Sequence, residues 1–458
     1  MNPAIFREYD IRGVADRDLT DDVVYRLGQA FGTYIQSNGV YQCVVGRDVR
    51  LSGPRIEKAL TAGLLATGVD VIKIGIVPTP VFYFSFFHLN INAGMMITAS
   101  HNPPDENGFK VGLNKTTIYG EEIQNLRRLA EDGRFRIGKG KVDSADVITP
   151  YIEMCHKKIK LTRPLKAVFD PGNGTAGVLL ERLFGSYPIK PIFINLKPDG
   201  TFPAHIPDPT VPEYLKEAIN LVKETNADCG FGYDGDADRI GTIDEKGNTI
   251  YGDRLLAILA REIIARHPKA KIVFEVKCSQ GLIEHIKSLG GTPVMWKTGH
   301  SLIKAKMKEE GALIAGEMSG HMFFADDYYG YDDAIFASLR VLRILNDSHK
   351  TLSQLAAEVP YYYATPEIRV KIQSPDADRL KFDIVNKLRE QFRKECQVID
   401  IDGARVIFGD SWGLIRASNT QPILVLRFEA KTPERLKEIQ QLFYQELQKF
   451  PEVVLPEC

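Results

Sequence analysis

The chain has 458 residues, 44% of them hydrophobic, so it can bury several cores and form about three or four domains. Lys and Arg total 58 against 59 Asp and Glu, and this balance excludes a global field that attracts nucleic acid or an anionic membrane. The most apolar window, 74–96, is interrupted by two prolines, a histidine and two asparagines, which argues against a membrane span. The first residues show no secretion signal and the six cysteines form no CxxC pair, so we expect a cytoplasmic protein.

Three segments repeat one local design, in which an apolar run ends in a polar turn and enters helix-like sequence. They are residues 42–48, 166–177 and 271–281. A short buried strand, a tight turn and a helix are the parts of a βαβ unit. We therefore expect three related α/β domains with mixed, mostly parallel sheets, which cover 1–147, 148–248 and 249–360.

The last hundred residues follow a different pattern. A strand-like segment at 367–372 precedes a helix-like stretch from about 375 to 396, and 422–430 is the strongest strand signal in the chain. Thr432 and Pro433 are suited to open a final helix as its cap and first-turn residues. We expect a separate α+β domain over 361–458.

A serine loop follows the apolar run 93–97. Ser100, in the loop 98–104, lies just past a predicted strand end, where open α/β sheets bind ligands, although serine, asparagine and proline also suit an ordinary turn. The loop lacks a Gly-x-Ser-x-Gly elbow, and His101 is a poor base for its neighbour because adjacent residues on an extended chain face opposite ways. Lys110 is close enough in sequence to return as a charge partner, or it is a surface lysine.

An acidic loop follows a second apolar run. Asp234, Asp236 and Asp238 alternate with small residues, and such clustered carboxylates call for a cation unless they form a solvated acidic loop. A straight strand would separate the outer two by about 13 Å, so the segment must curl, which Gly235 makes easy. An EF-hand would need glycine where Arg239 stands and a helix before the loop. Three carboxylates with room for a phosphate oxygen suit Mg²⁺.

Two further polar segments carry ligand-binding side chains. Glu317, Ser319 and His321 alternate, so on an extended segment they would face the same way and could hold sugar hydroxyls, or form a polar sheet edge. His300 ends a second polar turn after an apolar run. The segment 416–420 concentrates a guanidinium, two hydroxyls and backbone N–H groups, a composition that binds phosphate or belongs to a plain turn.

These segments together resemble the α-D-phosphohexomutase family, in its phosphomannomutase/phosphoglucomutase branch. The resemblance runs from Phe6-Arg-Glu-Tyr-Asp-Ile-Arg-Gly to Arg416-Ala-Ser-Asn-Thr, with four family loops in order. It implies three similar α/β domains and a fourth resembling the TATA-binding-protein fold around a central cleft. It also implies a phosphorylated Ser100 that shares a metal with the acidic loop, sugar recognition by Glu317 and Ser319, and a phosphate anchor formed by Arg416, Ser418, Asn419 and Thr420. By the same resemblance the cleft is lined by Tyr9, Arg12, His101, Lys110, Arg239, Lys277, His300 and His321.

The implied activity is reversible interconversion of hexose 1-phosphate and hexose 6-phosphate, for glucose and mannose. It would use Mg²⁺ and pass through a hexose 1,6-bisphosphate, with His321, His300 or Lys110 moving protons. The implied partner is a small phosphosugar, without nucleic acid or membrane, and we expect a monomer. The alternatives are phosphoglucosamine mutase, which a Gln in place of Met318 would suggest, a non-catalytic hexose-phosphate binding protein and a magnesium-dependent phosphatase.

Overall fold

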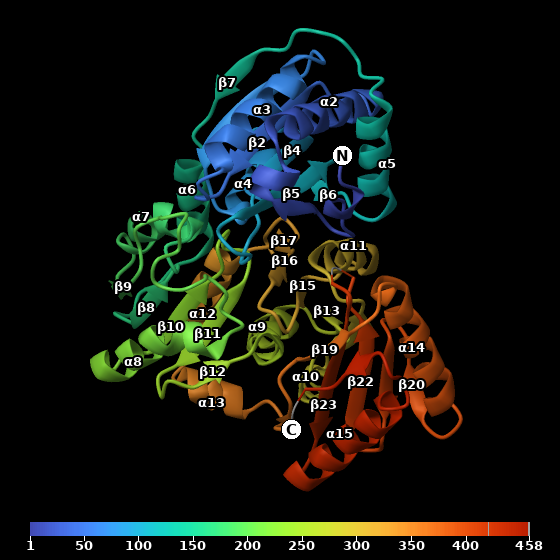
Figure 1. Ribbon diagram of the computed structural model, residues 1–458. Helices are drawn as coiled ribbons and strands as arrows, with labels where there is room; N and C mark the ends of the chain where they lie inside the picture. The colour runs from blue at the N-terminus through green and yellow to red at the C-terminus, as the bar shows by residue number, and fades with distance from the viewer. Residues whose placement is uncertain (420, 457–458) are drawn as a thin grey trace.

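The computed structural model describes residues 1–419 and 421–456, which form four sheets in chain order. In Figure 1 the blue N-terminal region lies at the top, the green region at the left and the red C-terminal region at the lower right. The strands of the third sheet lie between them (Figure 1). The chain is therefore arranged so that loops from all four regions can face one centre.

The first sheet has seven strands in the order β1-β5-β4-β2-β3-β7, with β6 beside β5. The strands are β1 (Ile11–Val14), β2 (Gln42–Arg47), β3 (Asp70–Ile76), β4 (Ala93–Ile97), β5 (Glu106–Leu113), β6 (Thr116–Thr117) and β7 (Val142–Ser144). The helices are η1 (Pro3–Ile5), α1 (Ala15–Asp18), α2 (Asp21–Ser37), α3 (Gly53–Leu65), α4 (Thr79–His88) and α5 (Glu121–Asp132). The antiparallel pairing of β4 with β5 sets Met96 opposite Lys110, and this register carries the lysine to the end of β4 where Ser100 follows.

The second sheet has the order β12-β11-β10-β8-β9. Its strands are β8 (Lys166–Asp170), β9 (Lys190–Phe193), β10 (Cys229–Tyr233), β11 (Ile240–Asp244) and β12 (Thr249–Ile250). Its helices are α6 (Ile148–Lys158), η2 (Thr175–Val178), α7 (Leu180–Phe184), η3 (Pro212–Leu215) and α8 (Lys216–Thr225). The acidic loop connects β10 to β11, which pair antiparallel.

The third sheet has the order β14-β13-β15-β16-β17. Its strands are β13 (Lys271–Glu275), β14 (Thr292–Trp296), β15 (Ile314–Gly316), β16 (Met322–Phe324) and β17 (Tyr331–Asp332). Its helices are α9 (Gly252–Arg266), α10 (Gln280–Ser288), α11 (His300–Glu310), α12 (Ala334–Asp347) and α13 (Leu352–Ala357). In the second and third sheets alike, two strand pairs are parallel and two antiparallel. The predicted mixed α/β sheets are confirmed, but parallel pairs do not predominate, because a hairpin extends each sheet on one side.

The C-terminal sheet is antiparallel at every pair among the described residues, in the order β20-β21-β22-β23-β19-β24 with β18 beside β23. Its strands are β18 (Tyr363–Ala364), β19 (Ile368–Ile372), β20 (Gln397–Ile399), β21 (Ala404–Ile407), β22 (Trp412–Ala417), β23 (Ile423–Ala430) and β24 (Val453–Val454). Two helices, α14 (Ala377–Phe392) and α15 (Pro433–Leu447), share one core with it. The predicted cap is present, since Thr432 accepts a hydrogen bond from the Arg435 amide at 3.2 Å. The predicted α+β region is confirmed.

The hydrophobic cores divide the molecule unevenly. One continuous cluster extends from α4 through the second sheet into α9 and α12, so the first three regions share a core. The C-terminal region has its own cluster, and its apolar contact with the rest is a small one of Trp412 and Leu414 with Val276. Within the described part of the chain, no helix has the combined length and apolarity that crossing a bilayer requires.

Candidate active site

Ser100 occupies a strained turn at the end of β4. Its φ of 51° lies in the left-handed region, which costs a non-glycine residue about 1 to 3 kcal/mol. The hydroxyl is buried and donates to Asp234 Oδ2 at 2.6 Å. It also lies 3.0 Å from His101 Nδ1, so the expectation that these neighbours face opposite ways is wrong. The reason is the left-handed backbone, which turns the two side chains toward each other.

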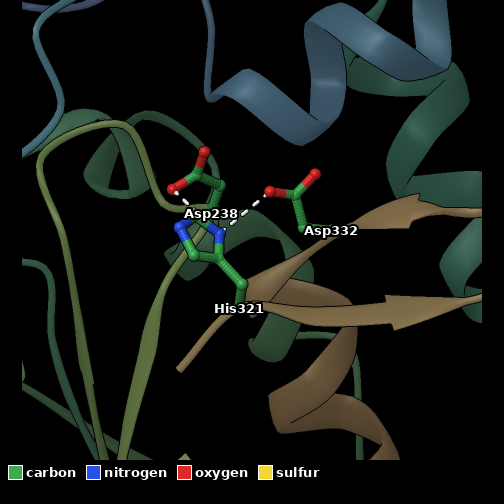
Figure 2. Close-up of side chains that lie close together, drawn as sticks. All are labelled: Asp238, His321 and Asp332. Atoms are coloured by element: carbon green, nitrogen blue, oxygen red, sulfur yellow. Dashed lines mark ion pairs between the residues drawn. The ribbon is translucent and has the colours of Figure 1, made fainter. Parts of the chain in front are cut away.

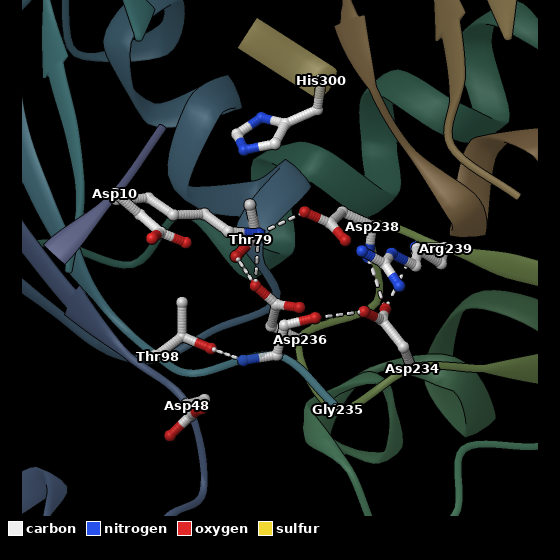
Figure 3. Close-up of polar contacts among 12 residues, drawn as sticks. Asp10, Asp48, Thr79, Thr98, Asp234, Gly235, Asp236, Asp238, Arg239 and His300 are labelled. Carbon is white, nitrogen blue, oxygen red and sulfur yellow. Dashed lines mark hydrogen bonds and ion pairs between the residues drawn. The ribbon is translucent and has the colours of Figure 1, made fainter. Parts of the chain in front are cut away.

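The acidic loop curls so that its three carboxylates converge (Figure 3). Asp234 Oδ1 accepts hydrogen bonds from the backbone amides of Asp238 and Arg239, each at 3.0 Å. The left-handed residue of the curl is Ala237, with a φ of 61°, rather than Gly235. Glycine is needed there for a different reason, because a Cβ on Gly235 would lie 2.3 Å from the Ser100 carbonyl oxygen. The strands on both sides exclude an EF-hand.

Lys110 neutralises part of this acidic cluster. Its ammonium donates to Asp236 Oδ2 at 2.7 Å and contacts Asp238, and Thr79 donates to the same Asp236 oxygen at 2.6 Å (Figure 3). Burial opposes its charge, but the two carboxylates outweigh burial and raise the pKa of Lys110 well above its usual value. Burial, then the charges of Asp238 and Asp236, raise the pKa of Asp234. The lysine is therefore a buried cation and not a surface side chain.

The three carboxylates fit a divalent cation. One oxygen from each lies within 4.8 Å of the others, and all three side chains are fully buried. Asp236 Oδ1 and Asp238 Oδ1 are buried without a hydrogen-bond partner, which is costly unless a cation approaches them. An all-oxygen set of this kind suits Mg²⁺ or a similar hard ion, with positions left for other ligands.

His321 lies between two carboxylates beside the acidic loop (Figure 2). Its Nδ1 is 2.9 Å from Asp332 and 3.6 Å from Asp238. Its Nε2 accepts from Arg239 Nε at 2.9 Å, so the ring proton is assigned to Nδ1. The hydrogen bond from Arg239 and the two nearby carboxylates therefore favour the tautomer with the proton on Nδ1.

The segment 316–321 is a tight turn between β15 and β16, not an extended strand. The Glu317 amide donates to the His321 carbonyl at 2.9 Å, so the expectation of one shared face does not hold for this turn. Glu317 is buried and accepts from the Gly299 amide at 2.7 Å, and burial, then the charge of Glu275, raise its pKa. Ser319 is half-buried in the same turn. The turn binds back to the loop that precedes His300.

Residues from the start of the chain reach this centre. Tyr9 donates to the Thr298 carbonyl at 2.9 Å and accepts from Asn419 Nδ2 at 2.6 Å, so it joins three of the four regions. Arg12 donates to Asn102 Oδ1 at 2.8 Å in the serine loop. Burial, then the charge of Lys304, hold the pKa of His300 well below its usual value, which leaves the imidazole neutral.

The predicted phosphate-binding segment begins in the last two residues of β22, Arg416 and Ala417. Arg416 is buried and donates to Asp402 Oδ2 at 2.9 Å, and Asp402 also accepts from the Thr298 amide at 3.0 Å. Lys277 forms a second link to this region through an ion pair of 2.9 Å with Glu367. Ser418 accepts from the Gln421 amide at 3.2 Å, whereas Thr420 lies outside the described residues.

Comparison with known proteins gives matches along most of the chain. Residues 3–136, 149–247 and 251–363 match Phosphoglucomutase/phosphomannomutase, alpha/beta/alpha domains I, II and III, and 367–446 match the C-terminal domain. A phosphomannomutase/phosphoglucomutase of Pseudomonas aeruginosa is 44% identical over 97% of this chain and 95% of its own. The chain belongs to the phosphoglucomutase/phosphomannomutase family.

Other members of the family agree with this assignment. A phosphoglucomutase of Neisseria gonorrhoeae is 40% identical over 99% of this chain and 98% of its own. A solved structure of a family protein from Burkholderia thailandensis superimposes with a TM-score of 0.93 at 43% identity and covers 99% of both chains. This similarity includes all four regions, so the family fold is complete in the chain.

Several polar residues of this phosphohexomutase were not found from sequence. Arg50 contacts the serine loop, Asp332 contacts His321, and Glu275 accepts from the Met318 amide at 2.9 Å. Arg50 and Glu275 had a usable signal, because each lies at or just after the carboxyl end of a predicted strand. Asp332 follows no such run, and its role depends on the β16–β17 hairpin.

Proposed function

We propose that the chain interconverts the 1-phosphates and 6-phosphates of glucose and mannose through a phosphoryl group carried on Ser100. The observation that supports this most strongly is the 2.6 Å hydrogen bond from the Ser100 hydroxyl to Asp234, inside a buried carboxylate set that fits a divalent cation. A phosphoryl carrier needs a cation and buried positive charge, and the carboxylate set and Lys110 would supply them here.

In the first half-reaction, phosphorylated Ser100 donates its phosphoryl group to the free hydroxyl of a hexose monophosphate. The bond from phosphorus to the serine oxygen breaks, a bond to the sugar oxygen forms, and the product is a hexose 1,6-bisphosphate. Mg²⁺ held by the three aspartates would offset charge on the transferring group. Lys110, kept protonated by Asp236 and Asp238, adds a second positive charge.

The proton of the sugar hydroxyl needs an acceptor. We propose His321, because Asp332 at 2.9 Å orients its Nδ1 in the manner of carboxylate-supported catalytic histidines. Its Nε2 then accepts the proton after the substrate displaces Arg239 from that atom. Arg12, His101, Arg239 and His300 complete the polar lining near the transferred group, and a proton returns to the serine oxygen as it leaves.

The other end of the substrate is held by a different region. We propose that Arg416, Ser418, Asn419 and Thr420 bind the non-transferring phosphate, while Glu317 and Ser319 bind sugar hydroxyls and Lys277 and Tyr9 lie beside them. After the first transfer the bisphosphate turns over within the cleft and returns its other phosphate to Ser100. The C-terminal region would hinge to admit the substrate and permit this reorientation.

We further propose that the four units span 1–147, 148–248, 249–360 and 361–458 and act as a monomer. Each unit would supply one loop to the cleft. Sedimentation equilibrium would test the monomer, and a second species at working concentrations would refute it.

A coupled assay tests the function directly. The protein is supplied with glucose 1-phosphate, mannose 1-phosphate or glucosamine 1-phosphate, together with Mg²⁺ and catalytic glucose 1,6-bisphosphate. Formation of the glucose and mannose 6-phosphates without net phosphate release is expected. Preference for glucosamine 1-phosphate would indicate phosphoglucosamine mutase, release of phosphate would indicate a phosphatase, and binding without turnover would indicate a non-catalytic protein.

A further inference from the structure

Arg50 is a fully buried arginine whose guanidinium binds the backbone of the serine loop. Its two terminal nitrogens donate to four carbonyl oxygens, each at 2.5 to 2.8 Å. The acceptors are the carbonyls of Ser100, Asn102, Pro103 and Glu106. Its Nε lies 3.2 Å from Asp48 Oδ2, which provides the opposite charge. One side chain thus binds three carbonyls of the loop that carries Ser100 and one at the start of β5.

The loop needs such support because Ser100 is held in the left-handed region. A strained backbone persists only where its surroundings determine it strongly. The Ser100 amide donates to Thr98 Oγ1 at 2.9 Å, and its carbonyl is held by Arg50 on one side and faces Gly235 on the other. Arg50 therefore fixes the position of the Ser100 carbonyl at the contact between the serine loop and the acidic loop.

A loop of the second region covers Arg50 from outside. The Phe202 ring lies 5.3 Å from the guanidinium carbon, and a Cβ on Gly200 would lie 2.9 Å from Arg50 Cα. Thr175 in the same region donates through its amide and its hydroxyl to the Gly235 carbonyl, at 2.9 and 2.8 Å. The two loops are thus held from both sides by residues that do not belong to either loop.

We infer that Arg50 is a positioning residue for phosphoryl transfer, which sets the Ser100 oxygen against the three carboxylates without touching the substrate. This inference rests on the proposed role of Ser100. A lysine cannot replace it, because a single ammonium with three N–H groups cannot reach four divergent carbonyls. The charge would remain and the geometry would be lost.

The test compares Arg50→Lys with Arg340→Lys, which alters an equally buried arginine that pairs with Glu262 and Asp326 away from the cleft. Arg50→Lys would misplace the nucleophile, so kcat is expected to fall by about 100-fold while KM for glucose 1-phosphate changes by less than about threefold. In phosphorus NMR, the phosphoserine signal of Arg50→Lys is expected to shift or broaden. Arg340→Lys is expected to lower Tm while leaving kcat and the signal unchanged.

Asp48→Asn provides a milder second variant in case Arg50→Lys does not fold. It keeps the shape of the side chain but removes the charge beside Arg50, so a smaller fall in kcat with the same constant KM is expected. Wild-type kcat in a folded variant would overturn the inference, and so would equal losses in both lysine variants. Ser100→Ala separates the two claims. If that variant is inactive while Arg50→Lys is fully active, only the positioning role fails, whereas an active Ser100→Ala refutes the proposed function itself.

Discussion

The proposed site has two ends, the serine and acidic loops on one side and the Arg416 segment on the other, and different cores support them. The serine and acidic loops follow β4 and β10. Met96 of β4 and Phe231 and Tyr233 of β10 belong to the continuous core of the first three regions. The Arg416 segment begins at the end of β22, where Ile415 and Ala417 pack into the separate C-terminal core. Arg416 is as buried as Ser100, so exposure does not distinguish the two ends. The difference is that the core beneath the serine and acidic loops is partly shared between regions, whereas the core beneath Arg416 belongs to the C-terminal region alone.

The contacts between the C-terminal region and the rest are mostly polar. They include Asn419 with Tyr9, Asp402 with the Thr298 amide and Glu367 with Lys277. Polar interfaces with a small apolar centre are typical of domains that move relative to each other. On the proposed function, the serine and acidic loops would form a preassembled transfer site and the Arg416 segment a mobile phosphate anchor, and each prediction below tests one side of this contrast.

The largest expected effect is at the acidic loop. Asp236→Asn, or removal of divalent ions with EDTA, is expected to lower kcat at least about 1,000-fold, because charge compensation for the transferring group is lost. Steady-state kinetics with added Mg²⁺ measures this. Asp326→Asn is the control, since it changes a buried carboxylate that pairs with arginines elsewhere. If Asp236→Asn is as active as that control, the proposed metal has no role in the reaction.

The next effect concerns substrate binding at the other end. Arg416→Ala removes the proposed charged partner of the substrate phosphate, so KM for glucose 1-phosphate is expected to rise about 10- to 100-fold while kcat falls less. Arg393→Ala, an exposed arginine of the same region that pairs with Asp400, should change neither. A fall in kcat as large as that of Asp236→Asn would show that the two ends are not separate.

The last effect is on the free energy of unfolding, within the shared core. Burial raises the pKa of Asp333 to about 7, although Phe336 N–H and the hydroxyls of Tyr328 and Tyr151 donate to it. The folded protein therefore favours the protonated carboxyl, so the contribution of Asp333 to stability is fully present below about pH 4 and is lost as the pH rises toward 7. Relative to Asp333→Asn, the free energy of unfolding should fall by about 1.4 kcal/mol per pH unit over that range. Parallel denaturation curves for the two proteins at all pH values would contradict this.

The order of the elements and the identity of the loops could be predicted because they depend on local patterns. Apolar runs that end in polar turns marked β4 and β10, and alternating carboxylates marked the acidic loop. Side-chain directions could not be predicted in the same way. The proximity of His101 to Ser100 depends on one left-handed residue, and the turn at 317–321 depends on a hairpin, neither of which a residue pattern fixes.

Contacts between distant segments also could not be predicted from the sequence. Asp332 and His321 meet because β16 and β17 pair, and Arg50 reaches the serine loop because β2 lies beside β4. Gly235 shows the same limit, since its need for a small side chain comes from Ser100, 135 positions earlier in the chain. Charged residues at the carboxyl ends of strands were the signal that would have found Arg50.

Hydrogen exchange with and without glucose 1-phosphate tests the contrast between the two ends most directly. Slower exchange is expected in 361–366, at the start of the C-terminal region, and in 412–419, where the proposed anchor would close on the substrate. Exchange in 93–97 and 229–233, the strands that carry the transfer site, should stay unchanged. Equal slowing at both ends, or slowing confined to the transfer site, would contradict a preassembled site facing a mobile anchor.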